Sequence, residues 1–183
     1  MIQRALQDDV VLLRPYSVDD IDPLYEAARE SLVEVGRWLP WCHPQYGRAE
    51  AEAWVLGRAK AWSAGQEYSF VIAKLDSGEF LGGCGLNQLE PLARRANLGY
   101  WVRTSATGNG YATRAARLLA RWGAVHLGLE RMEIVAAVGN TGSQRVALKA
   151  GATREGVARC RRRANDVQHD AVVFSIIRKD IVQ

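Results

Sequence analysis

Two glycines, Gly108 and Gly110, could build an anion-binding turn. They lie between an apolar stretch at 97–102 and an alanine-rich stretch with helical periodicity that begins at Tyr111. A helix start leaves backbone N–H groups unpaired and carries a partial positive charge, so a phosphate there gains hydrogen bonds and dipole attraction. Glycines also let the backbone approach such a ligand closely. The segment predicts a phosphate site, although Gly-x-Gly is also common in ordinary turns.

The segment Thr107-Gly-Asn-Gly110-Tyr-Ala112 resembles the acetyl-coenzyme A motif of the GNAT acyltransferase superfamily, Arg/Gln-x-x-Gly-x-Gly/Ala. Thr107 replaces the usual Arg or Gln. Downstream, 140–152 is similar to the second family signature, which is Asn-x-x-Ser, a short helix and Lys-x-Gly. Because two signatures occur at a plausible separation, a chance match is a poor explanation, and the sequence predicts a coenzyme site.

The N-terminal part resembles one branch of that superfamily. Leu13-Arg-Pro15 and Arg37-Trp-Leu-Pro-Trp41 look like the RimJ/RimL type, whose members acetylate protein N-termini and some small amines. The resemblance runs from about Val10 to Arg178.

The resemblance implies a role for each part of these motifs. Backbone amides from Asn109 to Thr113 would bind the pyrophosphate, and a strand amide would polarise the thioester carbonyl. The catalytic candidates are Asn140, which would contact the pantetheine or the amine, and Ser143, which would protonate the departing thiolate. The expected cofactor-binding residues are Trp101, Val102, Thr107, Gly108, Asn109, Gly110, Tyr111, Ala112, Thr113 and Asn140.

The acceptor side is less specific. The resemblance implies that Trp38, Leu39 and Trp41 wall the acceptor pocket, whereas aromatics in an apolar stretch are also typical of a core. Asn140 can equally be a helix cap, and Ser143 an exposed serine. A general base is left open among bound water and four side chains, which are Glu67, Glu90, Asp166 and His169.

Composition excludes several classes of protein. The chain has 183 residues, 48% hydrophobic and 24% charged, and its apolar runs are far shorter than the roughly 20 residues of a membrane helix. Without a recognisable signal segment, we expect the cytoplasm. Three widely spaced cysteines disfavour both a disulfide framework and a zinc site, so no metal is expected.

Charge is distributed unevenly. Residues 1–50 carry five Lys and Arg against nine Asp and Glu, so the remainder holds an excess of positive charge. That excess coincides with the coenzyme motifs and suits a polyanionic ligand. The basic run Arg159-Cys-Arg-Arg-Arg163 could also indicate a nucleic acid-binding site. Because no aromatic residues flank the run, a solvated edge or a binding patch for an acidic partner is favoured instead.

Periodicity predicts one domain over 1–183 with an α+β fold. Strands are expected near 10–15, 68–75, 80–86, 98–102, 132–138, 156–163 and 171–177. Helices are expected from about Asp19 to Gly36, from Arg48 to Ser63, from Tyr111 and over 143–149. The family resemblance adds that this mixed, mostly antiparallel sheet of about seven strands splays after the fourth, with helices on both faces.

The sequence thus predicts an acetyl-coenzyme A-dependent N-acetyltransferase that transfers directly to a primary amine, namely a protein or peptide N-terminal α-amine. Small amines such as polyamines, amino acids or aminoglycosides are the alternative acceptors. A non-catalytic acyl-coenzyme A-binding regulatory module is the alternative from another class. No membrane partner is expected, nucleic acid is disfavoured, and a homodimer is left open.

Overall fold

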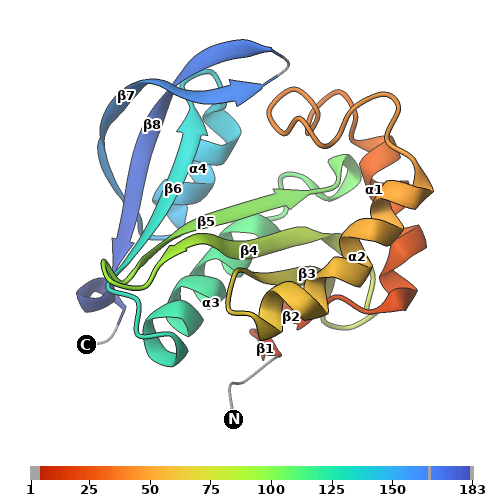
Figure 1. Ribbon diagram of the computed structural model, residues 1–183, viewed down its shortest axis with the longest axis horizontal. Helices are drawn as coiled ribbons and strands as arrows, with labels where there is room; N and C mark the ends of the chain where they lie inside the picture. Colours follow the sequence, from red (N-terminus) through yellow and green to blue (C-terminus); the bar gives the residue numbers. More distant parts are fainter. Residues whose placement is uncertain (1–4, 165, 182–183) are drawn as a thin grey trace.

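Eight strands form one mixed sheet in the order β1-β2-β3-β4-β5-β6-β8-β7 in the computed structural model, which describes residues 5–164 and 166–181 (Figure 1). The strands are β1 (Leu6–Gln7), β2 (Val11–Pro15), β3 (Tyr68–Lys74), β4 (Phe80–Glu90), β5 (Arg95–Val102), β6 (Arg131–Ala137), β7 (Thr153–Ala164) and β8 (Val167–Ile177). The helices are α1 (Ile21–Glu30), α2 (Arg48–Ser63), α3 (Tyr111–His126) and α4 (Thr141–Lys149), with short 3-10 turns at Val18–Asp20, Thr104–Ala106 and Arg178–Asp180.

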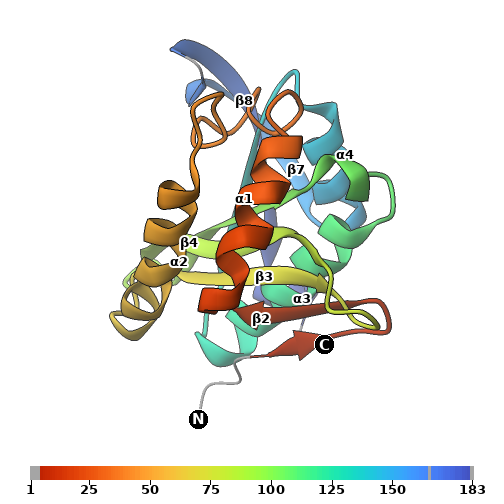
Figure 2. The ribbon, with the colours of Figure 1, turned by 90° about the vertical axis from the view of Figure 1, so that its right-hand side faces the viewer.

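Helices cover both faces of the sheet, as the sequence predicts (Figures 1 and 2). One core lies between the sheet and α3, and it includes the fully buried side chains Phe70, Leu119 and Trp122. A second core lies under α1 and α2 on the opposite face. The sheet therefore holds two sets of helices in fixed positions around β4 and β5.

The sheet opens between β5 and β6. These neighbours are parallel and pair only from Arg95–Asn97 to Arg131–Glu133, whereas every other pair in the sheet is antiparallel. Beyond Asn97 the two strands diverge (Figure 1). Because β5 is the fourth strand of the predicted order, the expected splay is confirmed, and the two-residue β1 is an addition to the expected seven.

The first helix is shorter than its apolar pattern predicts. It ends at Glu30 and not at Gly36. The Oγ atom of Ser31 accepts a hydrogen bond from the N–H of Thr104 at 3.0 Å, and the Glu30 carboxylate accepts one from the N–H of Ser105 at 2.8 Å. These long-range bonds tie the loop after α1 to the end of β5, so the expectation of a continuous helix is wrong.

Candidate active site

The start of α3 presents unpaired backbone donors. Gly108 and Gly110 have φ values of +83° and +80°, a left-handed conformation that favours glycine, and open space surrounds both. The first hydrogen bond of the helix runs from the N–H of Arg114 to the carbonyl of Gly110, at 3.1 Å. In the described part of the chain, no protein group accepts from the N–H groups of 108–113.

No acidic side chain lies in the first turn of α3, so nothing there repels an anion. The geometry fits the pyrophosphate of a coenzyme, because free N–H groups, a helix N-terminus and room for close approach coincide at one point. Thr107 lies beside this turn, but its hydroxyl donates to the carbonyl of Thr104 at 2.8 Å. Backbone groups, and not the residue that departs from the motif, supply the donors.

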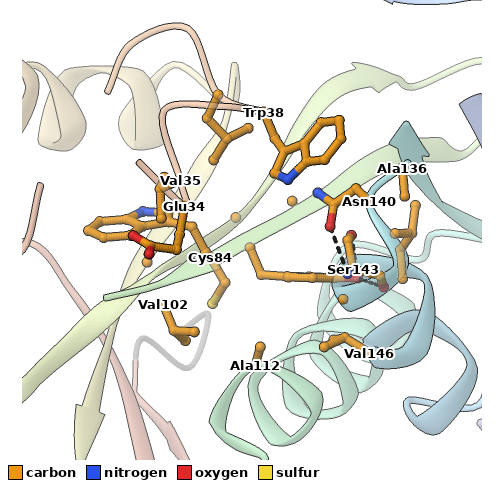
Figure 3. A pocket seen from close by; sticks show the side chains of 18 of the residues that line it. Glu34, Val35, Trp38, Cys84, Val102, Ala112, Ala136, Asn140, Ser143 and Val146 are labelled. Atoms are coloured by element: carbon orange, nitrogen blue, oxygen red, sulfur yellow. Dashed lines mark hydrogen bonds between the residues drawn. The ribbon is translucent and has the colours of Figure 1, made fainter. Parts of the chain in front are cut away.

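A cavity of about 1170 Å³ joins this turn to the splay between β5 and β6. Nearly all the predicted site residues line it, and Figure 3 shows Trp38 across the cavity from Ala112. The predicted residues that line it are Trp38, Leu39, Trp41, Trp101, Val102, Thr107, Gly108, Gly110, Tyr111, Ala112, Thr113, Asn140 and Ser143.

Asn109 is the exception among the predicted residues. It does not line the cavity, because its side-chain Nδ2 turns back and donates to the carbonyls of Ala106 and Thr107, at 3.3 and 3.2 Å. Any contribution of Asn109 to binding therefore has to come from its backbone N–H. Its side chain instead stabilises the turn that keeps the neighbouring donors in place.

Asn140 and Ser143 lie at the junction of β6 and α4. Asn140 caps α4, because its Oδ1 accepts from the N–H of Ser143 at 3.0 Å (Figure 3). The hydroxyl of Tyr100 donates to the Ser143 carbonyl at 2.9 Å and lies 3.2 Å from Ser143 Oγ. Burial raises the pKa of Tyr100 to about 12, so this phenol stays protonated at neutral pH. Ser143 is held from two sides with its hydroxyl at the cavity.

Tyr100 is a site residue that the sequence analysis missed. Strand alternation places Tyr100 and Trp101 on opposite faces, where Tyr100 packs beside the α3 core and Trp101 beside the α1–α2 core. Both nevertheless line the cavity, since it reaches both sides of β5 where the sheet opens. Had the splay been known, the alternation of side chains along β5 would have indicated that Tyr100 faces the cavity.

The predicted acceptor side of the cavity is built from aromatic rings. Trp41 contacts Trp101 edge-on with ring centroids 5.1 Å apart, and Trp38 contacts His169 with centroids 6.1 Å apart. Leu39 packs against the core under α1 and α2. The loop between α1 and α2 thus reaches across the splay to β8.

The four candidate bases are separated by the fold. Glu67 and His169 line the cavity, whereas Glu90 and Asp166 do not. Glu90 pairs with Arg95 at 2.8 Å, and Asp166 pairs with Arg163 at 2.8 Å. Glu67 is paired with Arg58 and accepts from the Ser69 hydroxyl at 2.5 Å. A proton acceptor among these four is therefore Glu67 or His169.

Residues 5–164 and 166–181 contain no cluster of three or more His, Cys, Asp or Glu that could hold a metal ion. None of their helices is long and apolar enough to cross a membrane.

Comparison with known proteins decides the family. The description "acetyltransferase (GNAT) domain" matches residues 11–153. The chain belongs to the GNAT acetyltransferase family. The reaction class of this family is acetyl transfer to an amine. Membership of the family therefore confirms the predicted use of acetyl-coenzyme A.

The relatives of this GNAT chain carry names of ribosomal N-acetyltransferases, which supports the RimJ/RimL type that the sequence predicts. It is 29% identical to the ribosomal-protein-serine acetyltransferase of Escherichia coli (strain K12) over 167 residues, 90% of this chain and 91% of the relative. It is 35% identical over 106 residues to YdaF of Bacillus subtilis (strain 168), provisionally named a ribosomal N-acetyltransferase, and this match spans 58% of either protein.

The fold has solved counterparts. The structure of RimL, a ribosomal L7/L12 α-N-protein acetyltransferase in complex with coenzyme A, superposes with a TM-score of 0.87. The alignment covers 95% of this chain and 98% of that one at 22% identity. This similarity shows that the GNAT fold extends through β7 and β8, beyond the residues of the family match.

Proposed function

We propose that this chain transfers the acetyl group of acetyl-coenzyme A to the N-terminal α-amine of a protein or peptide, directly and within a ternary complex. The observation that carries the proposal is the continuity of one cavity, from the unpaired amides at 108–113 to the aromatic wall at Trp38 and Trp41. Donor and acceptor can then occupy one space at the same time.

When bound, acetyl-coenzyme A supplies an activated thioester carbonyl. The N–H groups at 108–113 hold the pyrophosphate. The part of β5 after Asn97 leaves β6, so its edge faces the cavity and one of its amides can stabilise charge that develops on the carbonyl oxygen.

Proton transfer falls to Ser143 and to the acceptor side. The amine attacks after it loses one proton, to Glu67, to His169 or to water, while the new C–N bond forms and the C–S bond breaks. Ser143 Oγ donates a proton to the departing sulfur and regains one from the nitrogen of the new amide through water, while the protonated Tyr100 hydroxyl fixes the Ser143 backbone. The products are the acetylated amine and the free thiol.

The cysteines do not support an acyl-enzyme route. Cys84 lines the cavity, but burial raises the pKa of its thiol, which disfavours the nucleophilic thiolate. Cys160 is exposed and lies outside the cavity lining. Direct attack of the amine therefore remains the route that fits these residues.

The choice of an N-terminal α-amine rests on the names of the E. coli and B. subtilis relatives and on the width of the site. A cavity of this size, lined by the loop between α1 and α2 and by residues of β5, β7 and β8 among other elements, has room for a chain end together with the coenzyme arm. We also propose that residues 1–183 act as one domain in the cytoplasm.

A screen for acetyl-coenzyme A-dependent thiol release tests the acceptor. It would compare peptides with free N-termini, the same peptides with acetylated N-termini, and a panel of polyamines, amino acids and aminoglycosides. We expect release with free peptides and none with blocked ones. Release only with small amines would establish the alternative acceptor class. Coenzyme binding without release for any amine would instead support a regulatory module.

A further inference from the structure

Arg162 differs from the other arginines of the basic run on β7. Arg159, Arg161 and Arg163 are exposed, whereas Arg162 is partly buried and lines the cavity opposite the coenzyme turn. The match to the GNAT family description ends at residue 153, before this run begins. Arg162 therefore lies outside the part of the chain that the family match covers.

A bulge in β7 aims Arg162 into the cavity. Ala158 pairs with Ala171 and Arg162 pairs with His169, so three residues of β7 lie opposite one residue of β8. Within the bulge, Cys160 has a φ of +49° and its N–H donates to Asp170 Oδ1 at 2.9 Å. Such bulges redirect side chains beside functional sites.

The guanidinium of Arg162 has spare hydrogen-bonding capacity. Its one hydrogen bond in the described chain runs from Nη2 to the Trp38 carbonyl, at 3.5 Å, and no described carboxylate lies within ion-pair distance. The acids that line the cavity have other partners: Glu34 accepts from Thr104, Glu50 from the N–H of Gly47, and Glu67 is paired with Arg58.

A partly desolvated cation without an anion favours binding of an incoming anion. Burial, and then the nearby charge of Arg161, lowers the pKa of Arg162, yet a guanidinium stays protonated at neutral pH. Its planar donors suit a carboxylate, which can accept two parallel hydrogen bonds. The contact with Trp38 places this cation on the acceptor wall.

We propose that Arg162 binds a carboxylate near the acceptor's amine, so that the chain prefers peptides with an acidic residue close to their N-terminus. This proposal rests on the proposed function, because it assumes that the acceptor is a peptide. It assigns substrate selection to Arg162, while the chemical step remains with the groups around Ser143.

The wild-type protein tests this preference without any mutation. Peptides that differ only in carrying Asp, Asn or Lys at position 2, 3 or 4 would be compared by kcat/KM from thiol release. At the favoured position we expect Asp to exceed Asn by about 10-fold or more, the effect of one hydrogen bond between charged groups. Equal rates at all three positions would overturn the proposal and leave peptide acetylation standing. No release from any peptide would overturn the proposed function itself.

Variants locate the effect. R162Q should reduce the Asp-to-Asn ratio to about 1, and R162E should make the Lys peptide the better substrate. R161Q and R161E are matched controls, because Arg161 is adjacent and exposed and changes the overall charge equally. We expect R161Q and R161E to keep the Asp preference. An equal loss of preference in R161Q and R162Q would overturn the proposal, because it would indicate long-range attraction instead of a site. Acetyl-coenzyme A affinity, measured by calorimetry, verifies that each variant is folded.

Discussion

The donor and acceptor sides of the cavity are built in different ways. The proposed donor side is one continuous segment, 97–113, whose unpaired backbone N–H groups are the proposed ligands of the coenzyme. The acceptor side is assembled from the loop carrying Trp38 and Trp41, the start of β3, and the β7–β8 hairpin carrying Arg162. The first and the last of these segments are more than a hundred residues apart in the chain.

The difference shows why a coenzyme is easier to identify than its acceptor. Backbone donors need only a turn and a helix start, so several side chains in the turn can change without loss of the site. The replacement of the usual motif residue by Thr107 is an example, since its hydroxyl is used within the turn. The acceptor wall depends on side chains brought together by the whole fold, so it can differ between relatives of the same fold.

The largest effect is expected on the donor side. Gly110→Glu places a carboxylate beside the pyrophosphate and a side chain at a φ of +80°, so acetyl-coenzyme A affinity should fall by about 100-fold or more in calorimetry. Gly78→Glu is the matched control, because Gly78 has a φ of +74° and open space but lies outside the cavity lining. An unchanged acetyl-coenzyme A affinity in Gly110→Glu would contradict the assignment of the donor side to this turn.

The next effect is on the chemical step between the two sides. Ser143→Ala should lower kcat by about 100-fold and leave the acetyl-coenzyme A Kd unchanged, because it removes a proton donor. Tyr100→Phe retains the ring but loses the bond to the Ser143 carbonyl, so a smaller loss in kcat is expected. Steady-state kinetics with calorimetry separates the two. A wild-type kcat in Ser143→Ala would remove Ser143 from the mechanism.

A smaller effect is expected on the acceptor wall. Trp38→Ala removes the ring that contacts His169, so the acceptor KM should rise by about 10-fold while acetyl-coenzyme A affinity stays constant. Leu56→Ala is the control, an exposed apolar side chain on α2 that does not line the cavity. If Trp38→Ala instead weakened coenzyme binding and spared the acceptor KM, the division into two sides would be wrong.

The smallest effect is expected from Glu30, whose bonds to Arg103 and Ser105 connect the end of α1 with the segment before the coenzyme turn. Hydrogen bonding to Arg103, followed by bonds from Ser105, lowers the pKa of Glu30 to about 2 from 4.5. Because the folded-state pKa is lowered, this stabilisation is complete above about pH 4.5 and is lost as the pH falls towards 2. Glu30→Gln should lower the free energy of unfolding by about 1–2 kcal/mol at pH 7, and the difference from wild type should vanish towards pH 2.

The control for this prediction is Glu155→Gln. Bonding to Arg131 likewise lowers the pKa of Glu155 to about 2, but this pair lies away from the coenzyme turn. Thermal unfolding over a pH series measures stability, and calorimetry measures coenzyme affinity. We expect only Glu30→Gln to weaken acetyl-coenzyme A binding, by a few-fold. A pH-independent difference in stability would contradict the role of the Glu30 charge.

Features encoded locally were predicted from the sequence, and features that depend on distant contacts were not. Helix α2 has the predicted ends, Arg48 and Ser63, because its composition and flanking glycines act locally. The end of α1 was wrong because Ser31 bonds to Thr104, 73 residues away. The roles of Tyr100 and Arg162 depend on the splay and on the β7 bulge, which no local pattern specifies. The splay itself came from family resemblance.

The most direct test of the central claim follows the backbone amides at the start of α3 by 1H–15N NMR during titration with coenzyme A. The account predicts that the N–H resonances of 108–113 show the largest downfield shifts, since these donors gain a phosphate acceptor. Resonances that stay in place at 108–113 while coenzyme A binds elsewhere would contradict it.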